Sequence, residues 1–150
     1  MVHKGEIEIM ARGVCVLDGA LLLCHSAGAD NTYLPGGHID FGEAAVTALV
    51  REVEEELGLP SRAGRFLGTV EHAFHQDGVF HSEMNVVFEL TIEGLAAGVP
   101  PRSAEPHLDF RWCPLATLGD SDLEPAPLRT CLPRWLASGK AGWASTIESN

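Results

Sequence analysis

The longest regular pattern in the chain is an alternation of side chains over residues 79–92, VFHSEMNVVFELTI. A period of two is typical of a β-strand, because successive side chains point to opposite faces of the sheet. One predicted face is apolar and consists of Met84, Val86, Phe88, Leu90 and Ile92. The other predicted face consists of His81, Glu83, Asn85 and Val87.

A helical period begins shortly after the adjacent glycines Gly36 and Gly37. Apolar side chains recur three and four residues apart, which predicts a helix with one buried stripe. Asp40 is the predicted N-cap, and Glu43 would close a capping box. Gly58 is suited to the C-terminal end of the helix, and Pro60 blocks its continuation. The stripe consists of Val46, Leu49, Val50, Val53 and Leu57.

Shorter patterns fill in the rest of the predicted fold. Strands are expected at 7–17, 20–25, 65–75 and 110–115, with turns at Asp18-Gly19 and at 76–78. A Gly/Pro-rich loop is expected over 94–106. A second helix should cover about 126–137, with Pro127 in its first turn and Pro133 bending it. This order predicts one α/β domain over 1–150, with a mixed sheet, helices on both faces and a loosely ordered tail from about 139.

Composition narrows the range of partners. The 150-residue chain is 45% hydrophobic and carries a net charge of −11, so it lacks the basic surface of a protein that binds nucleic acid polymers or anionic membranes. Small phosphorylated ligands remain compatible, because a bound metal ion can supply positive charge. Four cysteines without a C-x-x-C pair, and no apolar signal core, predict reduced thiols and a cytoplasmic location.

The stretch REVEEELG, residues 51–58, places four glutamates within five positions of the predicted helix. Glu52, Glu55 and Glu56 are three and four residues apart, so they share one face. Like charges at these spacings cost about 0.2–0.5 kcal/mol per pair, and the C-terminal end of a helix disfavours anions. The cluster is either a solvated acidic face or a site for a divalent cation such as Mg²⁺.

The surrounding residues favour the cation site. Five residues separate Gly37 from Glu43, and seven more lead to Arg51-Glu52, which Val53, Glu55-Glu56, Gly58 and Leu59 follow. This spacing fills every specified position of the Nudix box, G-x5-E-x7-R-E-U-x-E-E-x-G-U, where U is a bulky aliphatic residue. The chain therefore resembles the Nudix hydrolases.

The resemblance implies an α/β/α sandwich fold and hydrolysis of a diphosphate linked to another moiety, usually in a nucleoside derivative. Water would attack phosphorus with the help of Mg²⁺, or of Mn²⁺ as a substitute. By position, the metal ligands would be Glu52, Glu55, Glu56 and the carbonyl of Gly37. Arg51 would orient these carboxylates together with Glu43. The general base would be Glu52 or a glutamate outside the box.

Residues outside the box leave alternatives open. Glu105, in the loop before the last predicted strand, is the first candidate for an additional glutamate, and Glu83 is its rival. Asn85 would hydrogen-bond a base or ribose, or else make a structural bond. Tyr33 would stack on a base, or else pack against its neighbours. Three histidines near the 76–78 turn are expected to be scattered pocket or surface side chains rather than metal ligands: His72, His75 and His81.

Markers of individual Nudix subfamilies are mostly missing. One group of ADP-ribose hydrolases has a proline about fifteen residues beyond the box, where this chain has Phe74. A group of diadenosine polyphosphate hydrolases has a downstream tyrosine, but the only tyrosine here is Tyr33. A nucleoside triphosphate or a nucleoside diphosphate derivative remains as the expected substrate. The alternatives are a catalytically silent Nudix-fold module with a nucleotide-binding or regulatory role, and an isomerase-like activity. A homodimer is a further possibility that the sequence leaves open.

Overall fold

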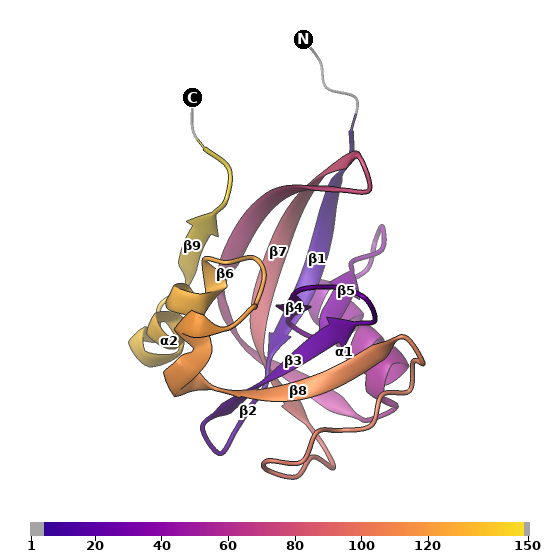
Figure 1. Ribbon diagram of the computed structural model, residues 1–150, viewed down its shortest axis with the longest axis vertical. Coiled ribbons are helices and arrows are strands. Elements are labelled where there is room, and N and C mark those ends of the chain that lie inside the picture. Colours follow the sequence, from indigo (N-terminus) through magenta and orange to yellow (C-terminus); the bar gives the residue numbers. More distant parts are fainter. Residues whose placement is uncertain (1–4, 149–150) are drawn as a thin grey trace.

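A computed structural model describes residues 5–148 of the chain, which form two β-sheets and two α-helices (Figure 1). The larger sheet is mixed, because β1 runs parallel to β7 and β9 runs parallel to β6, whereas the other two pairings are antiparallel. Its strands, in spatial order, are β5 (Gly36–His38), β1 (Ile7–Val14), β7 (Val79–Ile92), β6 (Ser61–Gln76) and β9 (Gly142–Ser145).

The smaller sheet is antiparallel and is built around β3, which pairs with each of the other three strands. A 3-10 helix, η1 (Leu115–Asp120), follows this sheet. The strands are β2 (Val16–Leu17), β3 (Ala20–Ser26), β4 (Thr32–Tyr33) and β8 (Leu108–Pro114).

The two helices, α1 (Ala45–Leu57) and α2 (Leu128–Ser138), belong to different halves of the core. Leu49 and Val53 of α1 pack in one cluster with Leu90 of β7. Leu132 and Trp135 of α2 pack in a second cluster, which includes Leu67, Val70 and Val87. Since Val87 and Leu90 lie on opposite faces of β7, the helices cover opposite faces of the mixed sheet. The predicted α/β fold is therefore confirmed.

The long hairpin of β6 and β7 matches the alternation in the sequence. The turn between its strands is formed by Asp77 and Gly78, both with positive φ (52° and 78°). Asn85 and Val87 are buried on the α2 side, and Val86 and Phe88 face the α1 side. Neither helix of the described chain has the length and hydropathy needed to cross a membrane.

Two predicted segments are wrong because long-range pairing overrides local pattern. Residues 7–17 do not form one strand, since the chain leaves β1 after Val14 and β2 then joins the other sheet. Residues 142–145, expected to lie in a loose tail, form β9 because their backbone pairs with the outer edge of β6. The strands that pair with β1 and with β9 are distant in sequence, so no local signal announced either outcome, whereas β2 pairs with β3 through the predicted Asp18-Gly19 turn.

The start of α1 is also later than predicted. The N-cap is Ala44 and not Asp40, although the backbone N–H of Asp40 still donates to Glu43 Oε1 over 3.1 Å. Both oxygens of Glu43 also accept hydrogen bonds from Arg51, which draws the turn of 40–43 toward the side of the helix. Gly58 ends the helix as predicted, with φ of 68° and its N–H donating to the carbonyl of Glu54.

Candidate functional site

The two glycines of β5 allow α1 to lie close to the strand backbone. A side chain at Gly36 would overlap the backbone of Ala11 on the neighbouring strand, and the φ of Gly36 is 133°. A Cβ at Gly37 would lie only 2.5 Å from the carboxyl carbon of Glu52. The glycine pair therefore lets the carboxylate of Glu52 reach the β5 backbone.

Arg51 lies among the carboxylates of this loop and helix. Its guanidinium donates two hydrogen bonds to Glu43, over 2.8 and 2.9 Å. It also donates to Glu52 over 3.0 Å, to Glu55 over 3.3 Å and to the carbonyl of His38 over 3.0 Å. Hydrogen bonding to Arg51, together with the N–H of Asp40, lowers the pKa of Glu43 to about 2. The single positive charge of Arg51 thus offsets part of the repulsion among three carboxylates.

Glu56 is the buried member of the acidic cluster, with only 6% of its surface exposed. Burial, together with the nearby charges of Glu52 and Glu55, raises the pKa of Glu56 to about 8. The positive charge of Arg12 and the backbone N–H of Gly36 act in the opposite direction. Its Oε2 atom has no hydrogen-bond partner among the described residues. An unpartnered buried carboxylate oxygen is costly unless a proton or a cation satisfies it.

The residues of this cluster fit a hard divalent cation. Such ions bind carboxylate and carbonyl oxygens, and the free Oε2 of Glu56 and the open backbone at Gly37 supply both. Over residues 5–148, however, no three His, Cys, Asp or Glu side chains already converge on one point as a metal shell. Glu52 and Glu55 are instead hydrogen-bonded to Arg51.

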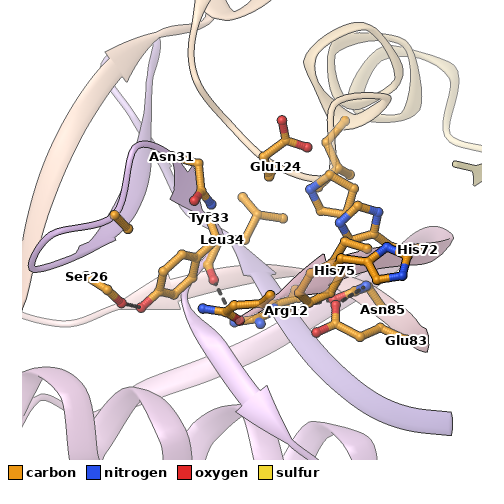
Figure 2. A pocket seen from close by; sticks show the side chains of 15 residues that line it. Arg12, Ser26, Asn31, Tyr33, Leu34, His72, His75, Glu83, Asn85 and Glu124 are labelled. Atoms are coloured by element: carbon orange, nitrogen blue, oxygen red, sulfur yellow. Dashed lines mark hydrogen bonds between the residues drawn. The ribbon is translucent and has the colours of Figure 1, made fainter. Parts of the chain in front are cut away.

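A cavity of about 620 Å³ lies beside this cluster (Figure 2). Its walls come from β1, β6 and β7 on one side, and from the loop between β3 and β4 and the start of α2 on the other. The polar side chains that line it include Arg12, Tyr33, His72, Glu83, Asn85 and Glu124. Its size and mixed lining suit a small organic ligand with a few polar groups.

Arg12 connects the cavity with the acidic cluster, and sequence reasoning missed it. Its guanidinium lies 5.3 Å from the centre of the Tyr33 ring and donates to the carbonyl of Leu34 over 3.1 Å. It also donates to Asn85 Oδ1 over 3.4 Å, and its positive charge opposes the rise in the pKa of Glu56. The available signal was a lone charged residue within the apolar stretch IMARGVCVL.

Asn85 is 1% exposed, and both ends of its amide are in use. Its Nδ2 donates to the carbonyl of Val70 over 3.4 Å and to Glu83 Oε2 over 3.3 Å, while Oδ1 accepts from Arg12. The amide therefore fixes Arg12 and Glu83 relative to each other. Glu83 lines the cavity, and its carboxylate faces the same space as His72 (Figure 2).

Aromatic side chains form another part of the cavity wall. His72 Nδ1 is 2.8 Å from Thr146 Oγ1, and burial lowers the pKa of His72. Phe74 stacks on the rings of both His72 and His81, with ring centroids 4.9 Å apart in each pair. The hydroxyl of Tyr33 is hydrogen-bonded to Ser26 over 2.7 Å, and burial raises its pKa. These contacts hold two rings, those of Tyr33 and His72, at opposite sides of the cavity (Figure 2).

Glu105 lies away from this cavity in the described structure. Its loop is tied to the C-terminal end of α1, because the N–H of Ala104 donates to the carbonyl of Glu56 over 2.8 Å. Ser103 Oγ donates to the carbonyl of Glu105 over 2.8 Å and accepts from its N–H over 3.0 Å. Of the two glutamates considered outside the box, Glu83 lines the cavity, and Glu105 belongs to a loop that is hydrogen-bonded to the C-terminal end of α1.

A family model described as the NUDIX domain matches residues 8–135, most of the chain. This chain belongs to the NUDIX family. Among curated proteins, no sequence matches it. The intact Nudix box on β5 and α1 is thus part of a Nudix fold, as the sequence predicted.

Solved structures agree with this fold. A MutT protein from Methanosarcina mazei Go1 is 21% identical, with a TM-score of 0.70, and the match covers 93% of this chain and 99% of that one. A MutT NUDIX hydrolase from Burkholderia pseudomallei is 28% identical, with a TM-score of 0.61 and coverage of 75% and 86%. An ADP-ribose pyrophosphatase from Streptococcus suis is 16% identical, with a TM-score of 0.63 and coverage of 93% and 99%.

The raised pKa of Glu56 predicts a pH-dependent stability of the metal-free Nudix chain. Between about pH 5 and pH 8, folded Glu56 keeps a proton that the unfolded chain releases, so the free energy of unfolding should fall as the pH rises. Each pKa unit of difference corresponds to about 1.4 kcal/mol. Glu56→Gln, which stays neutral, should remove this slope and melt at a higher temperature at pH 8 in EDTA.

The matched control is Glu54→Gln, on the same helix but exposed. It should keep the pH slope of the wild-type chain. Thermal melting at several pH values in EDTA measures both variants. If Glu56→Gln and wild type lose stability in parallel as the pH rises, Glu56 does not carry the raised pKa.

Proposed function

We propose that this Nudix chain is a metal-dependent pyrophosphohydrolase that cleaves a diphosphate linkage in a small nucleotide-type substrate. The observation that carries the proposal is the position of Arg12. It touches the walls of the cavity at Tyr33 and Asn85, and its charge acts on Glu56 of the box. A ligand with its organic moiety in the cavity would therefore direct its phosphates past Arg12 toward the box carboxylates.

The residues that would hold Mg²⁺, or Mn²⁺ in its place, are Glu52, Glu55, Glu56 and the carbonyl of Gly37. When bound, such a cation withdraws electron density from phosphoryl oxygens and neutralises their charge. Arg51 would orient Glu52 and Glu55, because it already donates a hydrogen bond to each of them. Glu43 in turn fixes Arg51 through two hydrogen bonds.

One carboxylate must take a proton from the attacking water. Glu52 is one candidate, since it lies against the β5 backbone beside the other box carboxylates. Glu105 is the second, because its loop is anchored to the carbonyl of Glu56 at the end of the same helix. Glu83 lies on the cavity side of Arg12, in hydrogen-bond contact with Asn85. We therefore assign Glu83 to substrate binding rather than to proton transfer.

The proposed substrate is a nucleoside triphosphate or a nucleoside diphosphate derivative. A cavity of about 620 Å³ is large enough for a nucleoside. Its aromatic walls at Tyr33 and His72 suit a flat base, and Glu83 and Glu124 are acceptors for its N–H groups. One similar structure is an ADP-ribose pyrophosphatase, and others are MutT proteins, so both substrate types belong in an assay panel.

Hydrolysis should require both a divalent cation and the box carboxylates. Wild-type chain with Mg²⁺ or Mn²⁺ should release phosphate, pyrophosphate or a nucleoside monophosphate from at least one member of a panel of nucleotides. Glu55→Gln and Glu56→Gln should each lower kcat by roughly 100-fold or more, because each removes a metal-binding charge.

Glu54→Gln, in the unspecified position of the box, should retain wild-type kcat. Turnover that survives in EDTA, or in Glu56→Gln, would contradict the assignment. A folded chain that binds nucleotides without any turnover across the panel would favour the silent binding module instead.

Arg12 should contribute to substrate binding through its positive charge. Arg12→Met removes a charged hydrogen-bond donor, so KM for the best substrate should rise roughly 10- to 100-fold while kcat changes less. Arg12→Lys should lie between Arg12→Met and wild type, because it keeps the charge but lacks the planar donor geometry. Equal KM values for all three proteins would exclude contact between Arg12 and the substrate.

Glu83 and Glu105 should affect different kinetic constants. Glu83→Gln should raise KM, since Glu83 lines the cavity, and Glu105→Gln should lower kcat if it assists the attacking water. Both constants are measured on the best substrate of the panel. Loss of kcat in Glu83→Gln with unchanged kcat in Glu105→Gln would reverse these roles. If neither variant changes kcat, Glu52 becomes the assigned base.

A further inference from the structure

The segment that follows β9 contacts a residue of the cavity wall, although it lies outside the part of the chain that the NUDIX model matches. That match ends at residue 135, whereas β9 ends at Ser145 and Thr146 follows it. The backbone N–H of Thr146 donates to the carbonyl of Glu71 over 3.0 Å, which continues the pairing of β9 with β6. The side chain of Thr146 is thereby held beside His72, the next residue of β6.

The hydroxyl of Thr146 makes two hydrogen bonds, to consecutive residues of β6. It accepts one from the backbone N–H of Ala73 over 3.1 Å, because a backbone N–H can only donate. Its second partner is His72 Nδ1, at 2.8 Å. The hydroxyl also carries one proton of its own, and Nδ1 is the only acceptor within its hydrogen-bond reach over residues 5–148. Donation of that proton to Nδ1 satisfies both groups.

This contact decides which nitrogen of His72 carries the ring proton. Burial lowers the pKa of His72, against the opposing charges of Glu83 and Glu124, so the ring is mainly neutral at neutral pH. A neutral imidazole has one donor nitrogen and one acceptor nitrogen. When Nδ1 accepts from Thr146, the ring proton lies on Nε2.

The ring of His72 is also fixed in orientation. Phe74 stacks on it, with ring centroids 4.9 Å apart and planes inclined by 22°. Because Nδ1 is bonded to Thr146, Nε2 is the nitrogen left for the cavity, and no side chain of the described residues forms a hydrogen bond with it. Glu83 lies opposite His72 on β7, and its carboxylate faces the same space (Figure 2). A donor on β6 therefore lies beside an acceptor on β7.

We propose that Thr146 is a positioning residue for ligand binding: its hydroxyl holds His72 as the Nε2–H tautomer, and this N–H donates to a ring nitrogen or carbonyl oxygen of a bound base. The inference rests on the proposed function, in which the cavity takes the base of a nucleotide. The Watson–Crick edge of each nucleobase carries such an acceptor next to an N–H group. The carboxylate of Glu83 is the matching acceptor for that N–H group.

The tautomer of His72 is observed directly by ¹⁵N NMR of the imidazole side chains, in the metal-free chain at about pH 7.5, where the ring is neutral. Wild type should carry the ring proton on Nε2 and none on Nδ1. Thr146→Ser keeps the hydroxyl and should show the same state, whereas Thr146→Val should add the Nδ1–H tautomer. A proton on Nδ1 of His72 in wild type, or identical spectra for wild type and Thr146→Val, overturns the proposal.

Nucleotide binding in EDTA tests the effect on the ligand without any catalysis. The probes are AMP, GMP, CMP and UMP, and the readout is the Kd of the one that binds most tightly. Thr146→Val should raise this Kd about 3- to 10-fold, as expected for one hydrogen bond, and Thr146→Ser should raise it less than about 2-fold. In a His72→Phe background, Thr146→Val should cause no further rise, because its effect passes through His72.

Ser145→Ala is the matched control, because it removes a hydroxyl from the same segment that donates to Glu71 Oε1 over 2.7 Å and not to His72. It should keep the wild-type tautomer and the wild-type Kd. An equal loss of binding in Ser145→Ala, an undiminished effect of Thr146→Val in the His72→Phe background, or no binding of any probe overturns the proposal. The expected tautomer and Kd changes without turnover in any assay would support the role of Thr146 and contradict only the proposed hydrolysis.

Discussion

The constraint on which the site depends is the crowding of carboxylates against the glycine backbone of β5. Glu52 approaches so closely that a side chain at residue 37 would meet it, and Glu56 is buried with one oxygen unpartnered. Such an arrangement is unfavourable by itself, because like charges repel and a buried carboxylate loses its hydration. Arg51 relieves part of it from one side, and Arg12 acts on Glu56 from the other. The free oxygen of Glu56 is what a cation would satisfy.

The two faces of β7 in the mixed sheet contribute to different parts of the molecule. Its α2-side face supplies Glu83 and Asn85, and Asn85 fixes Arg12 between the cavity and the acidic cluster. Its α1-side face supplies Val86 and Phe88, which pack against the core cluster that contains Leu49 and Val53 of α1. One alternating strand therefore supports both the candidate ligand site and the packing of α1.

Much of this organisation could be predicted from the sequence, since it rests on local pattern. The alternation of 79–92 and the helical stripe before Gly58 gave both elements, and the spacing of the box gave the family. The failures are long-range. The division of 7–17 between two sheets and the pairing of β9 with β6 depend on segments far apart in the chain. Arg12 was missed for the same reason, because its partners Leu34 and Asn85 are 22 and 73 residues away.

Mn²⁺ binding followed by electron paramagnetic resonance shows whether the box carboxylates bind a catalytic cation. The titration would include a non-hydrolysable nucleotide analogue and would compare wild type, Glu54→Gln and Glu56→Gln. Wild type and Glu54→Gln should bind Mn²⁺ saturably, Mg²⁺ should displace the bound Mn²⁺, and Glu56→Gln should bind Mn²⁺ much more weakly. Equal Mn²⁺ binding by all three proteins, or no saturable binding by wild type, would contradict this prediction.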